Sequence, residues 1–75
     1  MIFEIVRKII CEHFSVRKEQ VTLSSNISKD FNGDWLDWKE IIIYAEMVFD
    51  MEIPDEVLDS LATVGDLVSY IDSKL

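Results

Sequence analysis

Cysteine, proline and glycine are scarce in this sequence. Its 75 residues include one cysteine, one proline and two glycines. A single thiol at Cys11 cannot form an internal disulfide, which excludes the disulfide-stapled class of small secreted proteins. Two isolated glycines exclude the glycine-rich loops that bind phosphate groups. Because 49% of the residues are hydrophobic and no Pro- or Gly-rich stretch occurs, residues 1–75 are expected to form one small globular domain.

Long hydrophobic runs are absent as well. The longest uninterrupted run, residues 41–45, is far shorter than the ~20 residues that cross a bilayer. Charges at Glu4, Arg7 and Lys8 interrupt the N-terminal stretch where a signal peptide needs an apolar core. These features predict a cytoplasmic protein with no membrane span.

Basic residues are few and unevenly placed. The chain carries seven Lys and Arg against fifteen Asp and Glu, a net charge of −8. Residues 30–60 contain ten of the acids, and Lys39 is their only base. A negative potential of this kind repels nucleic acid and attracts basic protein surfaces, so we expect a basic protein partner and no nucleic acid. The alternative is a solvated acidic face that only keeps a small protein in solution.

What the sequence does contain is helical periodicity. Hydrophobic residues at i, i+3, i+4 and i+7 predict a first helix over residues 2–14. Asp34 as N-cap, with Asp37 three residues later, predicts a second helix over residues 35–49. Its hydrophobic residues are too many for one stripe, so this helix should be contacted on several sides. Its main core line is expected to be Ile41, Ala45 and Phe49.

The segment between these two helices has no hydrophobic period. Residues 15–27 are rich in Ser and Thr and contain isolated hydrophobic residues. Such a segment predicts a long loop held on the core by single side chains. The expected anchors are Val16, Val21, Leu23 and Ile27.

Two further helices are predicted after residue 49. Pro54 suits the first turn of a short third helix that contributes Val57, Leu58 and Leu61. Thr63 and Asp66 form a variant of the capping box at the start of a last helix that reaches Ile71. The sequence therefore predicts an all-α fold, a four-helix bundle with a long first loop and a short third helix.

The acidic stretch DFNGDWLD at residues 30–37 raises the possibility of a calcium site. Asp30, Asn32 and Asp34 match positions 1, 3 and 5 of an EF-hand loop. Such a loop needs glycine where Trp35 stands and a bidentate glutamate where Ile41 stands. A plain capped turn is expected instead, and no metal site is assigned.

Candidate catalytic residues are equally few. His13, the single histidine, lies on the apolar stripe of the first predicted helix and is expected to pack rather than to act as a general base. Cys11 lies on the same helix and is expected to be a small buried hydrophobic side chain. We therefore expect that the protein is not an enzyme and assign no catalytic residue.

Four stretches, in their order and spacing, resemble acyl carrier proteins. They are SVRKEQVT at 15–22, DFNGDWLDWKE at 30–40, FDMEIPDE at 49–56 and TVGDLVSYI at 63–71, which together span nearly the whole chain. The resemblance implies a bundle of the acyl-carrier-protein type. It also implies that Trp35 stands where the family has the serine of an Asp-Ser-Leu motif, the attachment point of phosphopantetheine.

Trp35 changes what the resemblance implies for function. An indole offers only an N–H donor and cannot attack a phosphoryl group of coenzyme A, so no cofactor is assigned. Ser28, the nearest upstream hydroxyl, lacks the flanking Asp and Leu. We expect the Trp35 ring either to anchor a protein interface or to cover the mouth between the second and third helices. Trp38 is expected in the core.

Without an attachment serine, the remaining function that the resemblance implies is docking of partner proteins on the second helix. In the family, this helix presents carboxylates and a few apolar side chains to partner enzymes. The predicted partner-binding residues here are Asp34, Trp35, Leu36, Asp37, Glu40, Ile43, Glu46 and Met47. They predict a monomeric, acidic protein-binding or regulatory module for enzymes of fatty acid or polyketide synthesis, or of acyl transfer.

Two alternatives remain open at this point. The first is a genuine acyl carrier protein of fatty acid or polyketide synthesis in which the serine has been changed to Trp35. The second is a structural subunit of a larger complex, which would elute with its partners in size-exclusion chromatography of native material.

Overall fold

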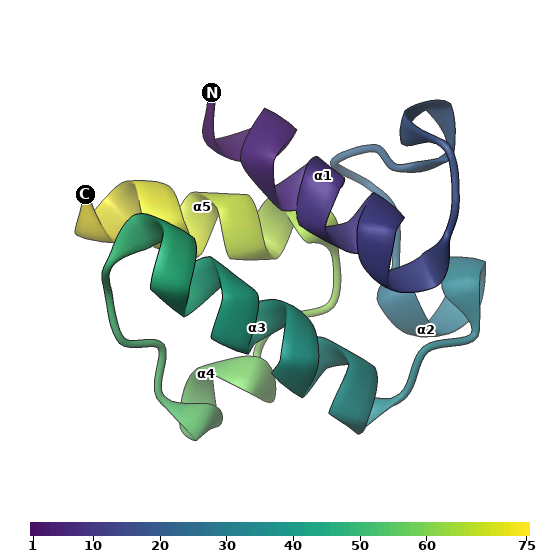
Figure 1. Ribbon diagram of the computed structural model, residues 1–75. Helices are drawn as coiled ribbons and strands as arrows, with labels where there is room; N and C mark the ends of the chain where they lie inside the picture. The colour runs from purple at the N-terminus through teal and green to yellow at the C-terminus, as the bar shows by residue number, and fades with distance from the viewer.

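The computed structural model describes all 75 residues, which form five α-helices and one 3₁₀ turn (Figure 1). The prediction of an all-α fold is confirmed, and the first two predicted helices have the expected bounds. None of the helices is long and apolar enough to span a membrane. In chain order the elements are α1 Ile2–Phe14, the 3₁₀ turn Lys18–Gln20, α2 Ile27–Phe31, α3 Trp35–Phe49, α4 Asp55–Leu58 and α5 Val64–Lys74.

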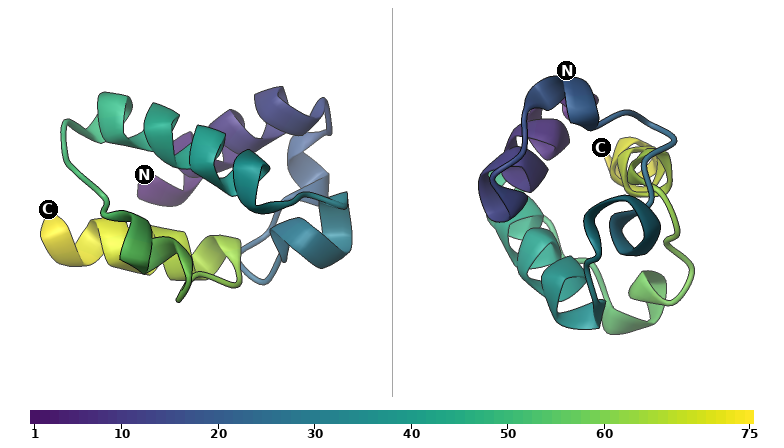
Figure 2. Two further views of the ribbon diagram at one scale, coloured as in Figure 1. Left: turned by 90° about the horizontal axis from the view of Figure 1, so that it is seen from below. Right: turned by 90° about the vertical axis from the view of Figure 1, so that its right-hand side faces the viewer.

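The hydrophobic core lies between the three long helices. α1 packs against both α5 and α3, while α4 lies along the bundle and α2 at one end of it (Figure 2). Because each long helix turns one stripe inward, all three contribute fully buried side chains. These are Val6 and Ile10 of α1, Ile41, Ile42 and Ala45 of α3, and Val64, Leu67 and Ile71 of α5.

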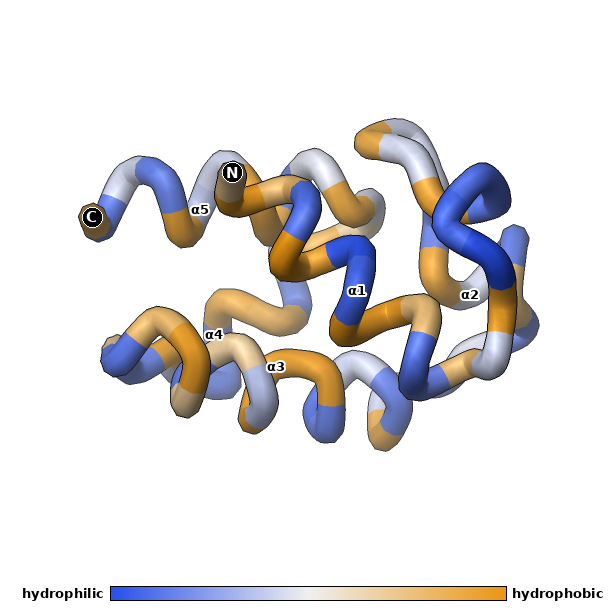
Figure 3. The backbone as a smooth tube through the Cα atoms, turned by 45° about the horizontal axis from the view of Figure 1, so that its top comes forward, coloured by the Kyte–Doolittle hydropathy of each residue, from blue (hydrophilic) through white to orange (hydrophobic).

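The prediction that the second helix is contacted on several sides is wrong. Hydrophobic residues run along the whole length of α3 (Figure 3). Only Trp38, Ile41, Ile42 and Ala45 are buried, and Phe49 of the predicted core line is half-buried. The reason is that α1 is the only helix that packs extensively on α3. One side of α3 is therefore hydrophobic and open to solvent.

A short helix, α2, lies in the segment that was predicted to be a loop and turn, so the α-helices number five rather than four. Asn26 caps it, because its Oδ1 accepts hydrogen bonds from the amides of Ser28 and Lys29, each at 3.0 Å. The Asp30 carboxylate in turn accepts the Asn26 amide at 2.7 Å. Five residues are too few to show a hydrophobic period, so this pair of caps was the only available signal.

Three of the four predicted loop anchors contact the core. Val21 and Ile27 are buried and Val16 is half-buried, whereas Leu23 is 51% exposed. The Leu23 prediction is therefore wrong. At this position the loop is attached through its backbone rather than through a side chain.

The backbone attachment is made to the first turn of α5. The carbonyls of Leu23 and Ser25 accept hydrogen bonds from the amides of Gly65 at 2.8 Å and Val64 at 2.9 Å. The first turn of a helix leaves such amides without a partner inside the helix. A Cβ at residue 65 would lie 2.9 Å from the Leu23 carbonyl oxygen, which explains the glycine there.

In the turn before α3, the backbone of Gly33 lies close to the side chains of Ile27 and Phe14. Gly33 donates its amide to the Ile27 carbonyl at 3.0 Å. A Cβ on Gly33 would lie 2.6 Å from Ile27 Cγ2 and 2.9 Å from Phe14 Cζ. Because Gly33 directly precedes Asp34, this packing determines where α3 begins.

Asp66 in the first turn of α5 gives a prediction on pH. The amides of Ala62, at 2.9 Å, and Thr63, at 3.0 Å, donate to its carboxylate and hold its pKa below the ordinary value. A carboxyl group with a pKa lowered by folding contributes stability that is fully present above its unfolded pKa of about 3.9. That contribution is lost as the pH falls through the lower folded value.

We therefore expect Asp66→Asn to lower the free energy of unfolding by about 0.5 kcal/mol at neutral pH, a small effect because the side chain is exposed. The difference from the parent protein should shrink as the pH falls below about 4. Urea unfolding of both proteins at neutral pH and near pH 3 measures this. A difference of the same size at both pH values would contradict the assignment.

Candidate functional site

The start of α3 is a capping box, as the sequence predicted. Asp34 accepts the Asp37 amide at 3.0 Å, and the Asp37 carboxylate accepts the Asp34 amide at 2.8 Å. The two bonds satisfy amides that the first turn would otherwise leave unpaired. They place Trp35 at the first helical position, outside the capping contacts.

The Trp35 side chain lies on the surface and is 50% exposed. The Lys39 ammonium lies 5.4 Å from the centroid of its ring and also forms an ion pair with Asp55 of α4. Trp35 is not among the hydrophobic side chains that pack on the core, whereas Trp38 is buried as predicted. The sequence left two positions open for this ring, at a protein interface or over the mouth between the second and third predicted helices. Its exposure favours the first of them.

The open side of α3 forms a hydrophobic surface, which we call the α3 face. Its hydrophobic side chains are 46–71% exposed, and Met47 is the most exposed of them. The carboxylate-bearing side chain of Glu40, 63% exposed, also projects from α3. A groove of about 490 Å³ between α1 and α3 is lined in part by Ile43. The hydrophobic members of the α3 face are Leu36, Ile43, Tyr44, Met47 and Val48.

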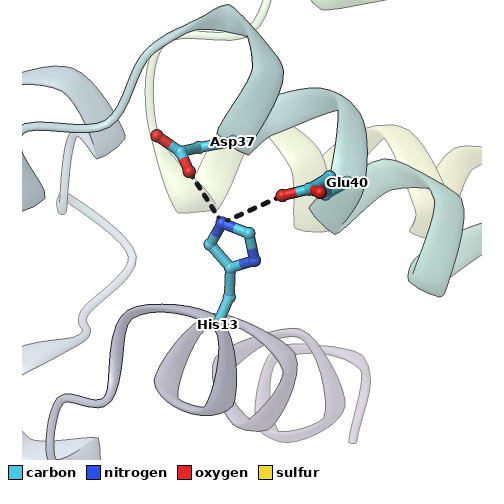
Figure 4. A group of neighbouring side chains, drawn as sticks. All are labelled: His13, Asp37 and Glu40. Carbon is cyan, nitrogen blue, oxygen red and sulfur yellow. Dashed lines mark hydrogen bonds and ion pairs between the residues drawn. The ribbon is translucent and has the colours of Figure 1, made fainter.

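His13 of α1 contacts the carboxylates of α3 (Figure 4). Its Nε2 lies 2.8 Å from Asp37 Oδ1 and 3.6 Å from Glu40 Oε1. The ring is mostly buried, as expected of a packing histidine, but its partners are polar groups of another helix. The hydrogen bond with His13, followed by that from the Asp34 amide, holds the pKa of Asp37 below its ordinary value.

Glu46, like Asp37, is half-buried rather than exposed. Its carboxylate accepts the amide of Ile53 at 2.8 Å. This bond holds the segment that leads from α3 to α4, so Glu46 has a structural contact that the sequence did not indicate. The structure brings Leu36, Ile43 and Met47 into the exposed α3 face.

Two members of the α3 face, Tyr44 and Val48, were not among the predicted partner-binding residues. Both were assigned to the general hydrophobic excess of the helix. That excess was itself the signal, because a helix with a single extensive packing partner can bury only one stripe. Residues beyond that stripe must face solvent or another protein.

Comparison with known proteins identifies the family. A family model described as the phosphopantetheine attachment site matches residues 4–71. The chain belongs to the acyl carrier protein family. An acyl carrier protein from Enterococcus faecalis is 38% identical, with 99% of this chain and 94% of that chain covered and a TM-score of 0.82. An acyl carrier protein candidate from Anaplasma phagocytophilum is 36% identical, with 97% of this chain and 86% of that chain covered and a TM-score of 0.85.

Family membership confirms the resemblance found in the sequence and implies a phosphopantetheine group. Covalent attachment needs a hydroxyl at the start of α3, and Trp35 supplies none. No Ser or Thr occurs between Ser28 and Ser60, and Tyr44 lies more than two turns farther along α3. The residues at the start of α3 therefore do not fit covalent attachment of the arm.

Acyl carrier proteins are carriers rather than enzymes, and the assignment of no catalytic residue to this chain stays a prediction. Cys11 is half-buried, and burial raises the pKa of its thiol. A raised pKa disfavours the reactive thiolate, in keeping with the expectation of a packing residue.

Proposed function

We propose that this chain is a monomeric, single-domain acyl-carrier-type module that acts without a phosphopantetheine arm. It docks through the α3 face onto a basic surface of a cytoplasmic enzyme of fatty acid or polyketide synthesis, or of acyl transfer. Its role there is protein binding or regulation. The observation that carries this proposal is the exposed hydrophobic side of α3 in a chain with a net charge of −8.

The hydrophobic part of the α3 face supports a protein partner. The five large hydrophobic side chains of the α3 face are exposed, as is Trp35 of the same helix, although the opposite side of α3 contributes to a buried hydrophobic core. Contiguous exposed apolar surface of this kind typically marks an interaction site. The groove between α1 and α3 makes the α3 face concave at this point, so that side chains of a partner can insert into it.

The charges around the α3 face support a basic partner. Glu40 projects from α3, and Asp34 and Asp50 lie exposed at its two ends. Lys39, the one base of the helix, is already paired with Asp55. Negative potential beside an apolar surface accelerates association with a basic surface and helps set its orientation.

Binding to purified acyl-chain synthesis and transfer enzymes of the same organism tests the proposal. At least one enzyme should bind at low salt and more weakly at high salt. We expect Glu40→Lys to weaken that binding by roughly tenfold or more, about 1.4 kcal/mol. Met47→Ser should cost about 1 kcal/mol, because it removes an apolar contact without a charge change.

Two matched changes away from α3 serve as controls. Asp72→Lys reverses a charge on the exposed side of α5, and Leu75→Ser removes an exposed hydrophobic side chain. Both should leave the affinity within about twofold of the parent value. The proposal fails if none of the enzymes binds, or if Asp72→Lys weakens binding as much as Glu40→Lys does.

The second candidate function is that of an acyl carrier protein of fatty acid or polyketide synthesis in which the attachment serine has been changed to Trp35. It is supported by the family match over residues 4–71 and by Asp34 and Leu36, which flank Trp35 as the motif requires. Under this alternative the surface recognised by the modifying enzyme is intact, and only the nucleophile is missing.

A further inference from the structure

His13, Asp37 and Glu40 bring three metal-ligating side chains together from two helices (Figure 4). One ligand atom from each lies within 4.8 Å of the other two. Asp37 and Glu40 are three residues apart on α3, so they project from the same side of that helix. His13 reaches them from α1.

The spacing of these atoms suits a small metal ion. Ligand atoms held about 2.0–2.1 Å from a tetrahedral ion lie about 3.3–3.4 Å from one another. The Nε2 of His13 is 2.8 Å from Asp37 Oδ1 and 3.6 Å from Glu40 Oε1, values on either side of that distance. An ion would replace the hydrogen bond between His13 and Asp37, so these two atoms must separate by about 0.5 Å and Nε2 must carry no proton. The Glu40 side chain is 63% exposed and can turn toward them.

Two of the three ligands are already oriented by neighbouring groups. The Asp34 amide binds Asp37 Oδ2 at 2.8 Å, which leaves Oδ1 directed at His13. The His13 ring is mostly buried and lies edge-on to Phe14, with ring centroids 4.8 Å apart. Such supporting contacts pre-arrange ligands and strengthen metal binding.

We propose that His13, Asp37 and Glu40 form a binding site for a divalent transition metal ion of the Zn²⁺ type. The imidazole nitrogen of His13 distinguishes this site from a cluster of carboxylates alone, since oxygen-only ligands suit Mg²⁺ and Ca²⁺ whereas imidazole suits Zn²⁺, Co²⁺ and Ni²⁺. Three protein ligands leave a fourth position open toward the groove beside α3. A bound ion joins α1 to the first two turns of α3, and the assignment does not depend on the proposed function.

The single histidine of the chain makes the proposal directly testable by NMR. In a titration of the ¹⁵N-labelled protein with ZnCl₂, the Nε2 signal of His13 should shift and saturate at one equivalent. Glu40→Gln should weaken binding roughly 10- to 100-fold, and His13→Asn should abolish the site. MgCl₂ at the same concentration should leave the imidazole signals unchanged.

Glu56→Gln is the matched control, because it removes the same charge from an exposed acid within the acidic stretch. It should bind Zn²⁺ as the parent does, and so should Cys11→Ser, which removes the one thiol. Glu40 is exposed, so its variant tests the site even if His13→Asn fails to fold. Absence of Zn²⁺ binding, Zn²⁺ binding without movement of Nε2, or equal affinities of Glu40→Gln and Glu56→Gln would each overturn the proposal.

Discussion

Trp35→Ser is expected to acquire a phosphopantetheine group from coenzyme A in the presence of a phosphopantetheinyl transferase, while the parent chain stays unmodified. The substitution restores the Asp-Ser-Leu motif at residues 34–36. It should leave the start of α3 intact, because the two capping bonds join Asp34 to Asp37 and do not involve the Trp35 side chain. The serine hydroxyl would stand at an exposed first helical position, where a transferase can reach it.

Intact mass spectrometry measures the outcome as the fraction of modified chains. Trp35→Ala is the control, because it removes the indole without supplying a hydroxyl and should remain unmodified. Failure of Trp35→Ser to react would mean that the surface around α3 no longer fits the transferase. That result would count against the second candidate function and would leave docking to other enzymes as the role of the α3 face.

Ile10→Ala is expected to cause the largest loss of stability. Ile10 is fully buried on α1, the helix that packs against both α3 and α5. Truncation of a buried isoleucine costs about 2–5 kcal/mol, and a domain of this size has only roughly 3–5 kcal/mol in total. Much of the variant should therefore be unfolded near room temperature.

Urea unfolding followed by far-ultraviolet circular dichroism measures this loss. Ile43→Ala is the matched control, since Ile43 is exposed on the α3 face and its truncation should cost less than about 1 kcal/mol. Similar losses for the two variants would mean that the core is not where the structure places it.

The sequence predicted those parts of the fold that depend on local signals. The apolar period gave the bounds of α1, and the Asp34–Asp37 pair gave the start of α3. Thr63 and Asp66 likewise marked the start of α5. Capping and periodicity act over three or four residues, so they can be recognised without knowledge of the tertiary structure.

The features that sequence analysis missed depend on contacts between distant residues. The His13–Asp37 hydrogen bond joins residues 24 positions apart. The bond between the Ile53 amide and Glu46 holds the segment between α3 and α4, whose path could not be predicted from the sequence. The open side of α3 follows from how few helices pack on it, and the hydrophobic excess of the helix alone does not distinguish a side covered by a neighbour from an open one. The exposed hydrophobic members of the proposed docking surface were therefore only partly predicted from the sequence.

We propose that this chain carries no phosphopantetheine arm, because Trp35 at the start of α3 supplies no hydroxyl. The most direct test is the intact mass of the protein purified from its native host. We expect the mass of the unmodified polypeptide, unchanged by treatment that releases phosphopantetheine. A mass increased by that group, at whatever residue, would contradict the account.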